Sequence, residues 1–371
     1  MPARHRVLTL ATLVALIAAA CGGVTSGTAS PSGSGLPSPA TSSSPATPSS
    51  SSASPSPAAE LQPVRLALDW TPNTNHLGFF AADAKGWYAD AGVKLDVLPY
   101  ATATPETLLT AHQAECGISF QDALTFAVAS GAPIVSVMAI LQHTGQELAV
   151  LASSSIQRPR DLDGKIYAGF GYPNEEPTVK AVIKADGGKG EFTSVIADTA
   201  AYEALYGKKA DFAIIFVAQE GVEAKLREIE LRTFKFTDYG FPDFYQVVLA
   251  CDRDWLAREP ELAKRFVDAT VRGWAFAAAE PEAAADLLVE ENPGVFDANP
   301  EVPVESAKYL ADGKYLVDPQ GNVGTQTLEQ WQGYSGFLFD QGLLTDRAGK
   351  PLTTAPDYAS LFTNDFLPAA G

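Results

Sequence analysis

Cysteine, methionine, histidine and positive charge are scarce in this sequence. Its 371 residues include 3 Cys, 2 Met and 4 His, and 26 Lys and Arg stand against 44 Asp and Glu. No Cys/His spacing indicates a metal site, and we expect neither a metal nor a cofactor. The formal net charge of −18 disfavours nucleic acid and anionic lipid headgroups as partners, because a strongly acidic surface repels both.

A long apolar run occurs near the start, at residues 7–20, after Arg4 and Arg6. It is too short to span a bilayer as a mature helix, but it suits the core of a signal peptide. The small residues before Cys21 resemble a bacterial lipobox, in which the cysteine is acylated and becomes the new N-terminus. An ordinary secretory signal with an incidental cysteine is the alternative. We expect residues 1–21 to be a lipoprotein signal and the mature protein to be lipid-anchored on the extracytoplasmic face of the cell membrane.

Charged and aromatic residues are absent from residues 22–59, which are almost wholly Ser, Pro, Thr, Ala and Gly. Such a composition cannot bury a core, so we expect a disordered tether over residues 22–60. A coil of this length spans about 35 Å, and proline extends it. The remaining chain, about 310 residues, suffices for two lobes.

From residue 64 onward, short strand patterns alternate with helix patterns. This βαβ order predicts an α/β protein with mainly parallel sheets flanked by helices. We expect lobe 1 to comprise residues 61–150 and 246–371, lobe 2 to comprise residues 151–245, and the chain to cross between them twice. Strands are expected at 64–70, 94–98, 116–120, 134–141, 166–169, 193–196, 210–216 and 246–251.

Several motifs in the chain resemble one known family. They are Leu68–His76 (LDWTPNTNH), Ala84–Tyr88 (AKGWY), Cys116–Ser119 (CGIS), Gly131–Ser136 (GAPIVS), Arg158–Lys165 (RPRDLDGK) and Gly207–Asp211 (GKKAD). Together they are similar to the type II periplasmic solute-binding proteins of ABC transporters, in the group that binds thiamine-pyrimidine precursors and is related to sulfonate and nitrate receptors. The resemblance covers about residues 64–255. It implies a two-lobed, venus-flytrap fold that binds its ligand in the cleft between the lobes.

In the aminopyrimidine binders of that family, an acid of the first-strand Asp-Trp motif meets an acid of the second lobe across the ring. Asp69 matches the first acid, and Glu220 matches the second because it follows the aromatic Phe216 at the family's spacing. A carboxylate accepts from the amino group of a 4-aminopyrimidine and from its protonated ring nitrogen, and such a bond contributes about 1.5–3 kcal/mol. Trp70 and Phe216 would sandwich the ring. The alternatives are a turn cap for Asp69, lobe packing for Trp70 and a solvated helix acid for Glu220.

Further candidates lie at strand ends and in turns, because ligands of parallel α/β sheets sit beyond the carboxyl ends of the strands. Each has a turn, rim or packing role as its alternative. A helix N-terminus can bind an anion, but the adjacent acids Glu175 and Glu176 would repel one at the helix that starts here. This disfavours a sulfonate or nitrate ligand. The candidates are Asn73, Asn75, His76, Phe120, Gln121, Gln142, Tyr172 and Glu175.

The resemblance also bears on the two cysteines that remain after export. In this fold, the strand that carries Cys116 usually neighbours the antiparallel strand that returns from the second lobe, and Cys251 ends that returning strand. We therefore hypothesise a Cys116–Cys251 disulfide, which can persist outside the cytoplasm. Two buried, inert thiols are the alternative.

An enzyme of the same family builds the thiamine pyrimidine from pyridoxal phosphate and a histidine. It uses a lysine for the cofactor, a histidine four residues later and a cysteine-rich motif. Here Ser119 and Ala123 stand at the lysine and histidine positions, and no cysteine-rich run follows. Because a Schiff base requires an amine, we expect no enzyme.

The expected function is therefore that of a monomeric receptor. It would close around a hydroxymethylpyrimidine or formylaminopyrimidine and deliver it to an ABC permease. A riboflavin-like compound, a sulfonate such as taurine, or nitrate are the alternative ligands.

Overall fold

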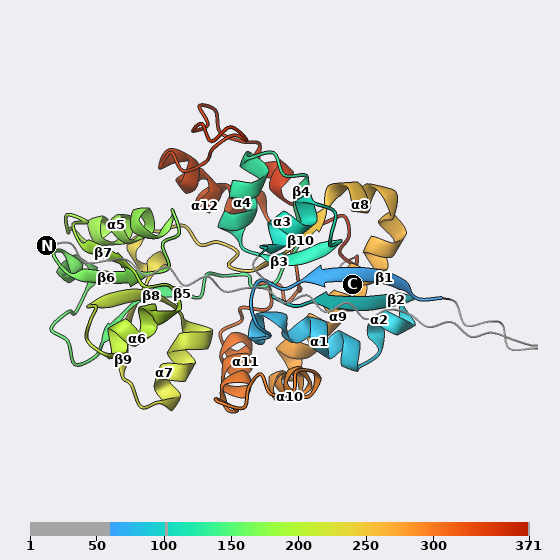
Figure 1. Ribbon diagram of the computed structural model, residues 1–371, viewed down its shortest axis with the longest axis horizontal. Helices are drawn as coiled ribbons and strands as arrows, with labels where there is room; N and C mark the ends of the chain where they lie inside the picture. Colours follow the sequence, from blue (N-terminus) through green and yellow to red (C-terminus); the bar gives the residue numbers. More distant parts are fainter. Residues whose placement is uncertain (1–59, 101–102, 370–371) are drawn as a thin grey trace, which may run out of the picture. The chain divides into compact units, whose positions relative to one another are not determined.

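Two five-stranded sheets organise residues 60–100 and 103–369, which are the residues that this computed structural model describes (Figure 1). The predicted signal peptide with Cys21, and the predicted tether up to residue 59, lie outside the described residues. Among the residues that are described, no helix has the length and apolar character needed to cross a membrane.

The first sheet belongs to lobe 1 and has the strand order β2-β1-β3-β10-β4. β10 runs antiparallel between β3 and β4, and the other strands are parallel to one another. β3 and β4 are buried along their whole length, as expected of strands covered on both faces by helices. The strands are β1 (Gln62–Ala67), β2 (Val93–Leu98), β3 (Cys116–Ser119), β4 (Ile134–Ala139) and β10 (Val248–Asp252).

The second sheet belongs to lobe 2 and has the order β7-β6-β8-β5-β9, with β5 antiparallel to its neighbours. Both sheets therefore confirm the predicted α/β fold with mainly parallel strands. The strands are β5 (Gln146–Leu151), β6 (Ile166–Gly169), β7 (Thr193–Ile196), β8 (Phe212–Phe216) and β9 (Leu231–Lys235).

One lobe boundary differs from the prediction. The sequence predicts that lobe 2 begins at residue 151, but β5 pairs with β8 and β9 and so belongs to the second sheet. The first crossing therefore lies at 140–145, and the second lies at 245–247, just before β10. The sequence prediction contains no strand at 146–151 and leaves these residues at the end of lobe 1. Hydrophobicity alone does not indicate which sheet such a segment joins.

Helices α1 (Leu77–Ala84) and α9 (Pro260–Ala279) approach each other closely in lobe 1. A Cβ on Gly78 would lie 2.3 Å from the Trp274 ring, and one on Gly273 would lie 2.0 Å from the Gly78 carbonyl oxygen. Both positions therefore require glycine. The other helices of this lobe are α2 (Trp87–Asp90), α3 (Pro105–Thr110), α4 (Gln121–Ala129), α8 (Arg253–Arg258) and α10 (Pro281–Glu291).

The C-terminal helices α11 (Val302–Asp312) and α12 (Leu328–Asp340) contact both lobes, although the sequence assigns them to lobe 1. On α12, Tyr334 stacks on Phe244 at a ring distance of 4.0 Å, within the core of lobe 2. α11 contacts the π-helical turn η4 (Val217–Gly221) and α7 (Val222–Leu226). The remaining helices of lobe 2 are α5 (Glu175–Ala185) and α6 (Ala201–Tyr206).

The structure contains the Cys116–Cys251 disulfide. The two residues lie directly opposite each other in the β3–β10 pairing, with their Cα atoms 4.0 Å apart, and both are fully buried. They are separated by 135 positions in the sequence. The bond therefore joins the first part of lobe 1 to the strand that returns from lobe 2.

Replacing both cysteines by alanine is expected to lower the free energy of unfolding by about 2–5 kcal/mol, because the crosslink closes a long loop in the unfolded chain. Urea denaturation of the two proteins measures this difference. Peptide mapping of the unreduced protein should recover the Cys116 and Cys251 peptides linked to each other. Recovery of both peptides with free, alkylatable thiols would contradict the pairing.

Candidate functional site

Asp69 is the second residue after the end of β1, and the buried side chain of His76 bonds its carboxylate. His76 Nε2 lies 2.8 Å from Asp69 Oδ1, and the His76 side chain is 0% exposed. The backbone N–H of Asn73 donates to His76 Nδ1 at 3.2 Å, so the ring proton is on Nε2 and is donated to Asp69. Within the described residues, Asp69 Oδ2 makes no hydrogen bond, and the side chain is 10% exposed. An oriented carboxylate with one available oxygen results.

The same turn, residues 73–76, divides its roles among the predicted candidates. Asn73 caps the turn, since its side chain accepts from the Asn75 N–H at 2.8 Å and donates to the Thr71 carbonyl at 3.0 Å. His76 orients Asp69, as described. Asn75 alone of these three lines a pocket.

That pocket lies between the lobes, beside the two crossings. Gln219 of η4 reaches across to Thr74 of lobe 1 and donates to its hydroxyl, which in turn is 2.7 Å from the Ser306 hydroxyl on α11. The pocket is lined by Asn75, Leu141, Gly145, Phe216, Ala218, Gln219, Gln246, Tyr309, Leu310 and Tyr315. Apart from Asn75 and Phe216, sequence reasoning missed this set.

The aromatic candidates form two separate pairs. Trp70 is 41% exposed and packs on Tyr100 at a ring distance of 4.8 Å. Phe120 of lobe 1 lies 6.3 Å from Phe216 of lobe 2, so this pair bridges the lobes. Trp70 and Phe216, predicted to enclose a ligand ring, thus each have an aromatic neighbour within the protein.

Glu220 is turned back into lobe 2. Its carboxylate accepts the backbone N–H of Phe216 at 3.0 Å and lies next to Tyr202, while Tyr206 donates to its backbone carbonyl. Burial raises the pKa of Glu220 to about 7. The contacts of its carboxylate in the described structure therefore lie within lobe 2.

Glu175, at the start of α5, binds the loop that precedes it. Its carboxylate accepts the backbone N–H groups of Phe170 at 3.1 Å, Gly171 at 3.3 Å and Tyr172 at 3.3 Å, and the Tyr167 hydroxyl at 3.0 Å. Tyr172 stacks on Phe170 and is 67% exposed. A carboxylate of the protein itself therefore occupies the N–H groups that an anionic ligand would use.

Gln121 and Gln142 are corrected from ligand candidates to structural residues. The Gln121 amide is fully buried and bonds the backbone of Gln330 and Trp331 on α12 as well as that of Tyr245. The Gln142 amide donates to the Thr325 carbonyl at 3.1 Å. Both amides join lobe 1 or its crossing to C-terminal segments, so the pattern of strand ends misassigned them.

A second contact between the lobes was missed by the sequence analysis. Asn174, just before α5, donates to Asp122 Oδ2 at 2.7 Å and to the Tyr334 hydroxyl at 2.9 Å. Burial raises the pKa of Asp122 to about 6. Asn174 thus joins lobe 2 to the start of α4 and to α12.

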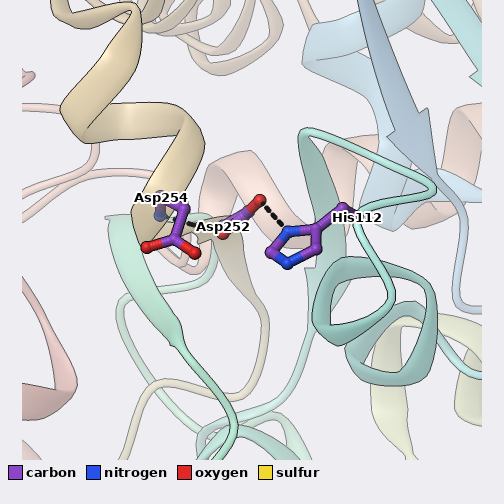
Figure 2. A group of neighbouring side chains, drawn as sticks. All are labelled: His112, Asp252 and Asp254. Carbon is purple, nitrogen blue, oxygen red and sulfur yellow. Dashed lines mark hydrogen bonds and ion pairs between the residues drawn. The ribbon is translucent and has the colours of Figure 1, made fainter.

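Figure 2 shows His112, Asp252 and Asp254, a group of side chains in the described residues with the spacing of metal ligands. Asp252 Oδ2 lies 2.7 Å from His112 Nδ1, and its Oδ1 accepts the Asp254 N–H and caps α8. The group lies at the end of β10 beyond the disulfide, whereas the pocket residue Gln246 precedes the start of β10. Capping and ion pairing account for these contacts.

Comparison with known proteins gives a family and several relatives. Residues 73–284 match the family model described as NMT1/THI5 like. A formylaminopyrimidine-binding protein of Halalkalibacterium halodurans is 26% identical, over 75% of this chain and 85% of the relative. The riboflavin-binding protein RibY of Chloroflexus aurantiacus is 25% identical, over 98% of each chain. A 4-amino-5-hydroxymethyl-2-methylpyrimidine phosphate synthase of Legionella pneumophila is 26% identical, over 62% of this chain and 74% of the relative.

Solved structures share the fold. The ligand-binding component of an ABC-type import system from Staphylococcus aureus superimposes with a TM-score of 0.61 at 14% identity, covering 82% of this chain and 97% of that one. The aliphatic sulphonate binding protein SsuA from Escherichia coli gives 0.58 at 15% identity, covering 80% and 94%. The chain therefore has the two-lobed periplasmic-binding-protein fold.

The raised pKa of Glu220 predicts a pH dependence of stability. Between pH 4.5, its ordinary pKa, and about 7, the folded protein keeps a proton that the unfolded chain releases. Stability from this group is therefore complete below pH 4.5 and is lost as the pH rises through about 7. Glu220→Gln should flatten the fall in melting temperature over this range, leaving the part that comes from the raised pKa of Asp122. The exposed control Glu261→Gln should keep the wild-type profile. A Glu220→Gln profile as steep as the wild type would contradict the assignment.

Proposed function

Because the chain belongs to the NMT1/THI5-like family, we propose that it is the substrate-binding component of an ABC importer and that it captures a thiamine-precursor aminopyrimidine between its lobes. The relative named a formylaminopyrimidine-binding protein supports this ligand class. The two-lobed fold supports capture by closure, in which the ligand stabilises the closed form through contacts with both lobes.

The observation that carries the ligand assignment is the oriented carboxylate of Asp69. His76 occupies Oδ1, so Oδ2 is left to accept the amino group of a 4-aminopyrimidine. A bond between a carboxylate and such a donor contributes about 1.5–3 kcal/mol in a site that excludes water. Trp70 and Tyr100 supply an exposed aromatic surface beside it, on which a planar ring can stack.

Two features of the site oppose an anionic ligand such as a sulfonate or nitrate. Glu175 already occupies the N–H groups of the 170–172 loop, so an anion there would meet a carboxylate. Asp69, Asp122 and Glu220 add further acids around the cleft, and the whole chain carries a formal charge of −18. A neutral or cationic ring is therefore favoured over an anion.

Riboflavin is the second candidate ligand, because the riboflavin-binding relative aligns along nearly the whole chain. A flavin is a wider planar ring than a pyrimidine, and the exposed rings of Trp70, Tyr100 and Tyr172 offer additional stacking surface. We rank it second because Asp69 Oδ2 can accept the amino group of an aminopyrimidine, whose neighbouring ring nitrogen becomes a second donor when protonated.

Receptor function is preferred to synthase function on the chemistry of one position. Ser119, which stands at the position of the enzyme's lysine, is fully buried and donates its hydroxyl to Glu106 at 2.5 Å. A hydroxyl in that environment cannot form a Schiff base with pyridoxal phosphate. The proposed receptor acts outside the cytoplasm as a monomer, where the Cys116–Cys251 disulfide can persist, and is held to the membrane through an acylated Cys21.

A ligand panel tests the proposal. We expect 4-amino-5-hydroxymethyl-2-methylpyrimidine and its formylamino counterpart to raise the melting temperature, and taurine and nitrate to leave it unchanged. Asp69→Asn should weaken binding by about 10- to 100-fold, because loss of the charge removes a charge-assisted bond. The exposed control Asp297→Asn should bind as the wild type does. A shift with taurine or nitrate alone would refute the pyrimidine assignment, and a shift with riboflavin alone would favour the second candidate.

A further inference from the structure

The pocket between the lobes is lined by amides, aromatic rings and apolar groups. Among the described residues that line it, none carries a charge. As whole residues, Asn75 and Gln246 are 8% and 4% exposed. The pocket has room for about one water-sized group.

The hydrogen-bonding capacity of these amides is only partly used. Within the described part of the chain, the Asn75 amide makes no hydrogen bond. Gln246 Oε1 accepts the Gly145 N–H at 2.5 Å, which leaves its NH₂ group without an acceptor among the described residues. Gln219 donates to Thr74, which leaves its Oε1 available. Among the described residues, the buried side-chain atoms without a hydrogen-bond partner are Thr178 Oγ1 and Trp274 Nε1, so the free atoms of these amides still reach solvent. A polar group of a ligand can replace water at them.

Each of the three amides comes from a different part of the fold. Asn75 belongs to the turn of lobe 1, Gln219 to η4 of lobe 2, and Gln246 to the second crossing. Only the arrangement in which the lobes meet brings them together. Asn75 also directly precedes His76, which holds Asp69, so one short turn joins the carboxylate to this pocket.

We propose that Asn75, Gln219 and Gln246 form a subsite for a small, neutral, polar substituent of the ligand, such as the oxygen of a hydroxymethyl or formyl group. This inference rests on the proposed aminopyrimidine ligand and specifies which substituent it carries. The amides both donate and accept, which suits a hydroxyl or a carbonyl group. They supply no positive charge, so a phosphate or sulfonate at the same position would be desolvated without compensation.

Calorimetric titration of the whole protein with three 4-amino-2-methylpyrimidines, which differ only in the group at C5, tests the subsite. A methyl group leaves the ring alone, a hydroxymethyl group adds the neutral oxygen, and a phosphooxymethyl group adds an anion. We expect the hydroxymethyl compound to bind about 3- to 10-fold more tightly than the methyl compound, and the phosphate to bind most weakly.

Variants separate the subsite from the ring site. Asn75→Ala and Gln219→Ala should each remove the advantage of the hydroxymethyl compound, so that the two neutral compounds bind with similar affinity. Because Gln219 also donates to Thr74 across the lobes, its replacement should lower the affinity for both compounds as well. Asn75 is buried, and its replacement by alanine can prevent folding. Gln219 is only partly buried, so the Gln219→Ala variant still tests the subsite in that case. The matched control is Gln320→Ala, at an exposed surface position.

The subsite is contradicted if the wild type binds the methyl and hydroxymethyl compounds equally well, or if it binds the phosphate most tightly. Either result leaves the proposed function standing. Variants that weaken both neutral compounds equally would do the same. Binding of none of the three compounds would contradict the proposed function itself, and the subsite with it.

Discussion

The hydrogen bond that His76 donates to Asp69 sets the chemistry of the cleft. It depends on the turn at 73–76, where a backbone N–H fixes the histidine tautomer. That turn is held by Thr74, which bonds Ser306 on a helix 232 positions away. α1 follows the turn and packs closely on α9, with Gly78 and Gly273 at the contact. The orientation of one carboxylate thus depends on the packing of this turn and of α1 against α11 and α9.

Several acids lie around the cleft, and burial of a carboxylate is unfavourable unless it is hydrogen-bonded or protonated. Glu175, Glu220 and Asp122 meet this requirement within the protein. Glu175 is satisfied by N–H groups of its own loop. Glu220 and Asp122 are half-buried and have no cation beside them among the described residues, and their pKa values rise to about 7 and 6. Asp69 is the acid that keeps an oxygen available. This division favours a ligand with donors at its edge and no negative charge.

Local patterns in the sequence predicted the mainly parallel α/β fold and eight of its strands, because these features depend on periodicity, and the family resemblance supplied the Asp69 motif. Strands β5 and β9 were not predicted. Local patterns could not predict the lobe to which β5 belongs, since an apolar strand suits either sheet. Gln121 and Gln142 were misassigned because their partners lie on segments about 180 to 210 positions away. Gln246, Tyr309 and Tyr315 escaped notice for the same reason, since only the tertiary fold brings them to Asn75.

The central claim is that an aminopyrimidine binds between the lobes with its amino group on Asp69. A crystal structure of the protein with 4-amino-5-hydroxymethyl-2-methylpyrimidine tests it most directly. The claim predicts the ring amino nitrogen within hydrogen-bond distance of Asp69 Oδ2, with His76 still bonded to Oδ1. A ligand bound elsewhere, or a ring in the cleft with Asp69 uncontacted, would contradict it.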